Sequence, residues 1–340
     1  MNIIKLGLIG AGRIGKLHAE NIARYIPEAR LVAVADAVKD VARDVAAKYG
    51  LTKVFQDYRD LVNDPEIDAV LICTSTNTHV EIIQAAAAAK KHIFCEKPLA
   101  LDLKEIDAAL IAVAQAGVTL QVGFHRRFDP HFQRLKELLD QGQIGRPWLL
   151  KITSYDPAPP PLAYIQVSGG IFLDMTIHDF DMARFLLGEV EEVYAAGAVL
   201  VDPAIGEAGD VDTAVVTLRF KSGALGVITN CRKATYGHDQ RIEILGERGG
   251  LFAENPLPHA TQLAKENGYH TAPLHYFFVE RYREAYVAEM RAFVEAVREG
   301  KEPPVTGLDG KIPVVIGYAA KRSLLERRPV RLAEIDPSLT

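Results

Sequence analysis

Two distant stretches of this chain carry residue types suited to removing a proton from an alcohol. Lys97 follows an apolar run, and Asp174, His178 and Asp181 are spaced i, i+4 and i+7. That spacing predicts that the three side chains share one face of a single helix. An imidazole can accept a hydroxyl proton, and an ammonium can stabilise the resulting oxyanion. Because a dinucleotide-binding motif opens the same chain, these groups indicate an enzyme that takes hydride from a secondary alcohol.

Each of these groups has an expected role. Pro98 keeps Lys97 out of the α region, so Lys97 is expected to extend into a cleft and bind the substrate hydroxyl. An imidazole titrates near neutrality, so His178 is the expected base. Asp174 would orient the ring, and Asp181 would bind a second hydroxyl. The alternatives are a surface lysine, an incidental histidine on a polar helix face, and a metal site. A dinucleotide already accepts hydride, so we expect no metal.

The amino-terminal region matches a dinucleotide-binding motif. Residues 10–15 read GAGRIG, they follow an apolar run, and Asp36 ends the next apolar run. In this context the glycines permit a tight turn and let the backbone approach a pyrophosphate at a helix N-terminus. Asp36 should accept hydrogen bonds from ribose hydroxyls and repel a 2′-phosphate, which predicts NAD rather than NADP. Lys39 is the nearest cation and argues the other way.

The first third of the chain alternates short β-branched runs with alanine-rich helical segments. This alternation predicts a parallel sheet covered on both faces. Thr74 and Asp36 both follow predicted strands, at the edge where such sheets bind ligands. The expected strands are 3–9, 31–35, 69–73, 92–95 and 119–123, and the expected helices are 16–25, 41–49, 80–90 and 103–116.

After residue 123 the pattern changes to strands in succession, which predicts an antiparallel or mixed sheet. Two long helices are expected, at 172–187 and 277–297, and the proline-rich segment 156–161 is expected to be a loop. We therefore expect two domains, residues 1–123 and residues 124–340. The further expected elements are a helix at 132–139, strands at 148–153, 193–201, 213–220, 224–230 and 241–245, and a hairpin turn at 221–223.

Composition narrows the possible partners. The chain has 340 residues and a formal net charge of −5, and no basic stripe that would suggest nucleic acid. Cys73, Cys95 and Cys231 lack paired spacing, as is typical of reduced thiols in a cytosolic protein. The first residues form a strand pattern rather than a signal peptide, and the alanine run at 85–89 is too short to cross a bilayer. A cytoplasmic protein with no membrane partner is expected.

Four segments resemble the glucose–fructose oxidoreductase and inositol dehydrogenase family (Gfo/Idh/MocA), and the resemblance extends over essentially the whole chain. Residues 96–98 (EKP) resemble the family signature. Residues 169–181, 123–128 and 236–241 resemble the inositol dehydrogenase branch. The resemblance implies a Rossmann domain, an α+β domain with an open, mostly antiparallel mixed sheet, and often a homotetramer packed through its sheets. It implies NAD-dependent oxidation of an inositol or a pyranose-type sugar.

The motifs and the resemblance together imply three sets of residues. The catalytic set is Lys97, Asp174 and His178. The cofactor-binding set is Gly10, Gly12, Arg13, Ile14, Gly15, Asp36, Thr74, Ser75, Asn77, His79, Glu96 and Lys97. The substrate-binding set is Lys97, His125, Arg127, Asp156, Asp174, His178, Asp181 and Tyr236.

Some assignments have alternatives. Ser75 replaces a proline found in many members, and Tyr155 replaces an arginine of many inositol enzymes, so the stereoisomer stays open. Asp156 is alternatively a turn residue, and Tyr236 a packed aromatic. The rival functions are an NAD-dependent glycosidase or epimerase and a dinucleotide sensor without turnover.

Overall fold

The computed structural model describes residues 3–339, which form two compact units. Unit 1 contains the chain up to Phe128 together with Glu284–Ile312, and unit 2 contains Asp129–Arg283 and the chain from Pro313. This division differs from the expected boundary after residue 123, because the segment Glu284–Ile312 packs with the amino-terminal sheet rather than with its sequence neighbours.

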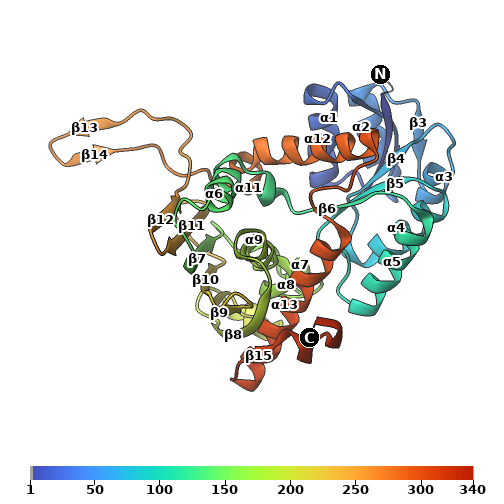
Figure 1. The fold of residues 1–340 in the computed structure, drawn as a ribbon. Helices are drawn as coiled ribbons and strands as arrows, with labels where there is room; N and C mark the ends of the chain where they lie inside the picture. The colour runs from blue at the N-terminus through green and yellow to red at the C-terminus, as the bar shows by residue number, and fades with distance from the viewer. Residues whose placement is uncertain (1–2, 340) are drawn as a thin grey trace. The chain divides into compact units, whose positions relative to one another are not determined.

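Unit 1 is built on a parallel sheet, as expected (Figure 1). The strand order β3-β2-β1-β4-β5-β6 places a switch point between β1 and β4, and ligands of such sheets bind there beyond the carboxyl ends of the strands. The strand β3 escaped sequence prediction because it has only three residues. The strands are β1 (Ile4–Ile9), β2 (Ala29–Ala35), β3 (Lys53–Phe55), β4 (Ala69–Ile72), β5 (His92–Glu96) and β6 (Leu120–Gly123).

Three helices cover one face of this sheet. Side chains of α1, α2 and α12 form one apolar core with Leu8 of β1 and Phe94 of β5. Local signals also bound the helices: Asp102 caps α5 by accepting from the backbone N–H groups of Lys104 and Glu105. The helices of unit 1 are α1 (Arg13–Tyr25), α2 (Lys39–Tyr49), α3 (Tyr58–Val62), α4 (His79–Ala88), α5 (Leu103–Ala116) and α12 (Arg283–Glu299).

Unit 2 contains a seven-stranded sheet of order β12-β11-β7-β10-β9-β8-β15. Only β7 and β10 pair in parallel, so the expected open, mostly antiparallel mixed sheet is confirmed. The expected turn at 221–223 is present, closed by the N–H of Gly223 donating to the carbonyl of Phe220. The strands are β7 (Pro147–Tyr155), β8 (Val190–Ala198), β9 (Thr213–Phe220), β10 (Leu225–Cys231), β11 (Asp239–Gly246), β12 (Gly249–Ala253) and β15 (Val330–Arg331).

A separate hairpin, β13 (Leu263–Lys265) and β14 (Gly268–His270), projects from this sheet (Figure 1). The remaining helices are α6 (Pro130–Asp140), α7 (Leu162–Ile165), α8 (Ile171–Asp174), α9 (Ile177–Leu187), α10 (Pro203–Glu207), α11 (Phe278–Arg281) and α13 (Gly307–Glu326), the last passing from unit 1 into unit 2 along the chain.

The expected single helix at 172–187 is wrong. The chain forms α8 and α9, separated at Met175 and Thr176. The N–H of Thr176 donates to the carbonyl of Ile171, five residues back, and the Thr176 hydroxyl also contacts that carbonyl at 3.2 Å. The backbone bond to the fifth residue back takes the place of the regular i→i−4 bond, so the helical ladder is interrupted here.

The expected helix at 277–297 is also two helices, α11 and α12. Tyr282 lies between the two helices, and its backbone angles, φ −111° and ψ 21°, are not helical. Within unit 2 its ring packs 6.4 Å from that of Phe132, and neighbouring Arg281 forms a buried ion pair of 2.5 Å with Asp129. These contacts favour the interrupted backbone over a continuous helix, an outcome that the helical period does not reveal.

Candidate active site

The glycine motif forms the turn between β1 and α1, and a different feature of the turn favours glycine at each of its three positions. Gly10 has φ +92°, which favours glycine. A Cβ on Gly15 would lie 2.0 Å from the carbonyl oxygen of Gly10, so only glycine allows this approach of helix and strand. A Cβ on Gly12 would meet no protein atom within 4 Å. The space before the N-terminus of α1 is therefore open, as a dinucleotide pyrophosphate requires.

The carboxylate of Asp36 is held against this turn. Its Oδ2 accepts from the N–H of Ala11 at 2.8 Å, and its Oδ1 accepts from the N–H of Val38 at 2.8 Å. An ionised carboxylate has about four acceptor positions, so lone pairs remain for the two hydroxyls of a ribose. This geometry fits the expected role, and two further expected cofactor residues, Arg13 and Ile14, are the first residues of α1.

The loop after β4 carries the next expected cofactor residues. Ser75 and Asn77 are exposed, and Thr74 Oγ1 accepts from the hydroxyl of Thr78 at 2.8 Å. His79 is 1% exposed, with Nδ1 2.9 Å from the carbonyl oxygen of Pro98 and Nε2 3.1 Å from that of Thr74. Burial lowers the pKa of His79, although both carbonyls oppose the shift. With both nitrogens facing backbone carbonyls, His79 ties this loop to the segment after Lys97.

Lys97 follows the carboxyl end of β5, at the edge where the glycine turn also lies. It is half-buried, and its bond to Pro98 is cis. The preceding residue, Glu96, was expected to bind the cofactor. Its Oε1 lies 2.7 Å from Nε2 of His18, a buried residue of α1. Sequence reasoning missed His18, whose only signal is a polar residue in the buried stripe of α1.

Two expected substrate residues lie in a short 3-10 segment, His125–Phe128, and have partners within unit 1. The ring of His125 stacks on that of Tyr286 with centroids 4.3 Å apart. Arg127 donates to Asp309 at 2.9 Å. Burial alone would raise the pKa of Asp309, but the charge of Arg127 and hydrogen bonds from Thr306 and Arg127 outweigh it and lower the pKa. Contact of His125 and Arg127 with a polyol remains an expectation.

Asp174, His178 and Asp181 all lie in unit 2, but not on one helix as expected. Asp174 is the last residue of α8, whereas His178 and Asp181 are three residues apart on α9. His178 is 8% exposed and Asp181 is fully buried. Asp174 accepts from the hydroxyl of Tyr164 at 2.9 Å and lies 3.4 Å from Nη1 of Arg232. The turn between α8 and α9, and not a helical period, decides where Asp174 points.

A buried polar network holds that turn and was not foreseen. Asn230 of β10 donates to Asp179 at 2.7 Å and accepts from the hydroxyl of Thr176 at 2.8 Å. All three side chains are buried, so each hydrogen bond replaces one that water would otherwise make. The network fixes the start of α9, which carries His178. An asparagine inside an apolar strand was the available signal in the sequence.

The last two expected substrate residues lie near the carboxyl ends of β7 and β10. Asp156 Oδ1 is 3.2 Å from Nδ1 of the buried His238. Tyr236 donates to Asp239 at 2.8 Å, and burial of the hydroxyl with this carboxylate raises the pKa of Tyr236 to about 12. The Tyr236 side chain is 55% exposed, which does not fit a packed core aromatic.

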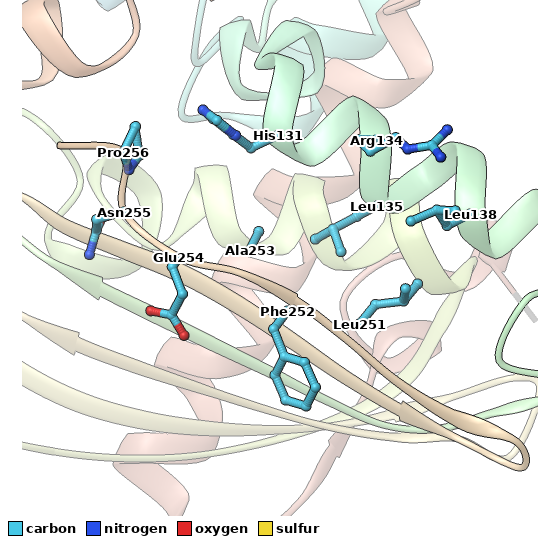
Figure 2. A pocket seen from close by; sticks show the side chains of 10 residues that line it. All are labelled: His131, Arg134, Leu135, Leu138, Leu251, Phe252, Ala253, Glu254, Asn255 and Pro256. Carbon is cyan, nitrogen blue, oxygen red and sulfur yellow. The ribbon is translucent and has the colours of Figure 1, made fainter. Parts of the chain in front are cut away.

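A pocket of about 350 Å³ in unit 2 lies between α6 and β12 and contains none of these residues (Figure 2). Its lining is His131, Arg134, Leu135, Leu138, Leu251, Phe252, Ala253, Glu254, Asn255 and Pro256. The pocket therefore does not belong to the expected polyol site. Across residues 3–339, no helix combines the length and apolar character needed to cross a membrane.

Comparison with known proteins points to one family. Residues 4–124 match the family model described as "Oxidoreductase family, NAD-binding Rossmann fold", and residues 132–252 match the "GFO/IDH/MocA C-terminal domain". The chain is 54% identical over 333 residues to a protein named "Myo-inositol 2-dehydrogenase" of Thermotoga maritima, covering 98% of this chain and 99% of that protein.

Similar solved structures are also dehydrogenases. A probable dehydrogenase from Thermotoga maritima has a TM-score of 0.96 and 54% identity, covering 98% of this chain and 100% of that one. A scyllo-inositol dehydrogenase from Lactobacillus casei, solved with NAD(H) and scyllo-inositol, has a TM-score of 0.92 and 32% identity, covering 98% of this chain and 100% of that one.

Proposed function

This chain belongs to the Gfo/Idh/MocA family of NAD-dependent oxidoreductases, and we propose that it oxidises a ring secondary alcohol of an inositol to the ketone. The observation that carries the proposal is near-full-length identity of 54% to a protein named as a myo-inositol 2-dehydrogenase. The open turn at Gly12 and the anchored carboxylate of Asp36 fit the cofactor.

The chemistry divides between the two units. NAD, when bound, supplies the hydride acceptor. In unit 1, Lys97 binds the reacting hydroxyl and stabilises the developing alkoxide. In unit 2, His178 accepts the hydroxyl proton and returns it in the reverse reaction, while Asp174 orients the ring and Asp181 binds another hydroxyl.

The remaining expected residues would recognise the other hydroxyls. His125, Arg127, Asp156 and Tyr236 are donors and acceptors suited to a polyol ring. A site built for hydroxyls rejects analogues that lack them, because its own polar groups would be left unpaired. Relatives are named for both myo- and scyllo-inositol, so the identity of the preferred isomer is a question for assay.

A substrate screen tests the function. The purified protein is assayed for NADH formation with myo-inositol, scyllo-inositol and glucose, and each reaction is repeated with NADP. We expect steady NADH formation with an inositol. The kcat/KM for that inositol should exceed the value for glucose, and the kcat/KM for NAD should exceed the value for NADP. Turnover of a glycoside or sugar epimer without net NADH would assign the rival function, and no turnover with any polyol would refute the proposal.

We further propose that the protein is a homotetramer that assembles through the outer face of the seven-stranded sheet. Leu245, Leu149 and Leu225 stand side by side on three neighbouring strands and are 42–49% exposed. Tyr194 and Val215, 40% and 44% exposed, extend this face onto β8 and β9. Alternate residues of the same strands are buried beneath. The ion pairs Lys151–Glu243 and Arg219–Glu192 lie on the same face, so the surface combines an exposed leucine cluster with charged residues, as protein interfaces often do.

The projecting hairpin supports the same proposal. All residues of β13 and β14 are exposed, including Leu263 at 54% and Tyr269 at 78%. An isolated two-stranded hairpin is marginally stable in water, so a second copy of the chain would support it. We also propose a cytoplasmic location, because Cys73, Cys95 and Cys231 are free thiols.

A further inference from the structure

A second cluster of titratable side chains lies in unit 1, outside the expected substrate contacts, and one of its members, Glu96, precedes Lys97 in sequence. His18 of α1, Glu96 of β5 and Glu289 of α12 each offer a nitrogen or oxygen atom, and these atoms lie within 4.8 Å of one another. The shortest contact joins Nε2 of His18 to Oε1 of Glu96 at 2.7 Å. Because a carboxylate only accepts, the ring N–H of His18 is the donor.

The surroundings of this cluster leave it little freedom. His18 and Glu289 are both 0% exposed, and the side chain of Glu96 is 13% exposed. The ring of His18 meets that of Phe94 edge-on at 5.1 Å and that of Tyr286 at 5.8 Å. A charge-assisted hydrogen bond in such an environment is strong and strongly oriented. The bond therefore restrains both α1 and the end of β5.

The position of Glu96 makes this restraint relevant to Lys97. Phe94 and Glu96 are two residues apart on β5, and both contact His18, so both point to the face covered by α1 and α12. Successive residues of an extended chain point to opposite sides. Anchoring Glu96 to one face therefore fixes the end of β5, from which Lys97 continues at the cofactor edge of the sheet.

The helix that carries His18 also links the cluster to the cofactor-binding turn. His18 lies on α1, whose N-terminus follows the open turn at Gly12. Because a helix is rigid, the position of its first turn fixes the positions of the residues that follow. The bond between His18 and Glu96 thus connects the segment that faces the pyrophosphate to the segment that presents the lysine.

We infer that His18 is a positioning residue for Lys97, acting through its hydrogen bond to Glu96. The inference rests on the proposed function of Lys97. It predicts that losing the bond slows the chemical step, because a small displacement of a catalytic group is costly in rate, while NAD binding, which uses the glycine turn and Asp36, is retained.

Two substitutions of similar size test the bond. His18→Gln keeps an N–H donor near the position of Nε2, whereas His18→Leu fills the space without a donor. We expect kcat to fall roughly 10- to 100-fold in H18L, with a smaller loss in H18Q, and the dissociation constant for NAD to stay within about twofold in both. Ile22→Ala is the matched control on α1, because Ile22 is 2% exposed and packs in the core. I22A should lower Tm and leave kcat unchanged.

A double-mutant cycle with Lys97→Ala separates positioning from general damage. If His18 acts through Lys97, H18L should have no further effect on kcat in the K97A background. Additive losses, or weakened NAD binding with normal kcat in H18L, would overturn the inference. Near-normal kcat in K97A alone would instead overturn the proposed role of Lys97. A third result would overturn the inference about His18. If the purified protein contained stoichiometric metal that is lost in H18L, His18 would be a metal ligand rather than a positioning residue.

Discussion

At the scale of single residues, the candidate catalytic and binding residues could be predicted from the sequence, but the side chains that contact them could not. Residue types in short motifs indicated Lys97, His178 and Asp36, and the structure places each of these where the motif context implied, at a strand end or on a helix. The partners come from remote parts of the chain. Asp309 is 182 residues from Arg127 in sequence. No local spacing encodes such a pair, because folding alone brings its members together.

The proposed base gives the most direct residue-scale prediction. Replacing His178 with Ala should lower kcat by about 10²- to 10⁴-fold, the usual contribution of general acid–base assistance. Steady-state rates with the best inositol, together with a thermal melt to confirm folding, measure this. An H178A enzyme with kcat close to that of the parent would exclude His178 as the base.

The pair of Arg127 and Asp309 predicts a pH-dependent contribution to stability. The pKa of Asp309 is lowered from 3.8 in the folded chain, so the unfolded state binds more protons at acid pH. The stabilisation is present above about pH 4 and is lost as the pH falls through the lowered value. Asp309→Asn should cost on the order of 1–3 kcal/mol at neutral pH. Denaturant unfolding of both proteins should show this difference shrinking toward pH 3; a constant difference would contradict it.

At the scale of elements, turns and breaks decide the geometry of the site. The period of hydrophobic residues predicted a continuous helix at 172–187. The N–H of Thr176 donates instead to the carbonyl of Ile171 and its hydroxyl to Asn230, and the chain forms α8 and α9. Asn230 lies 54 residues from Thr176. By contrast, the glycine turn was predicted correctly, since its geometry depends on residues close in sequence and on the absence of a Cβ.

The two unstrained glycines of that turn predict opposite phenotypes. A Cβ at Gly12 meets nothing within 4 Å, so Gly12→Ala should fold with an unchanged Tm but bind NAD more weakly. A Cβ at Gly15 would lie 2.0 Å from the Gly10 carbonyl, so Gly15→Ala should lose about 1–3 kcal/mol of stability. Thermal melts and NAD titrations of both variants provide the comparison. Equal losses of Tm would show that the turn has no open side.

At the scale of the whole molecule, the chain folds into two units whose membership does not follow the sequence. The segment Glu284–Ile312 joins unit 1, where Met290 and Phe293 complete the core beside α1. The sequence predicts a boundary after residue 123, because the alternation of strand and helix patterns ends there. The return of α12 depends on apolar complementarity with a sheet formed some 200 residues earlier, which a local pattern does not report.

The exposed sheet face gives the prediction that belongs to this scale. Leu149→Glu and Leu225→Glu each place a charge on the proposed interface and leave the buried face of the strand untouched. We expect light scattering to show a smaller assembly than the parent, with the same circular dichroism spectrum. Leu325→Glu is the control, since Leu325 is 75% exposed on α13 and is not part of the seven-stranded sheet. An unchanged mass in both interface variants would place the interface elsewhere.

The sequence alone determined the class of fold, the cofactor turn and the residue types available for catalysis, because each depends on periodicity or on motifs spanning a few positions. Only the tertiary structure decided that Glu96 bonds to His18, that Asp174 ends one helix while His178 lies on the next, and that α12 belongs with the first sheet. The physical reason is the same in each case. These outcomes depend on which remote side chains share a buried environment, and burial is a property of the folded chain.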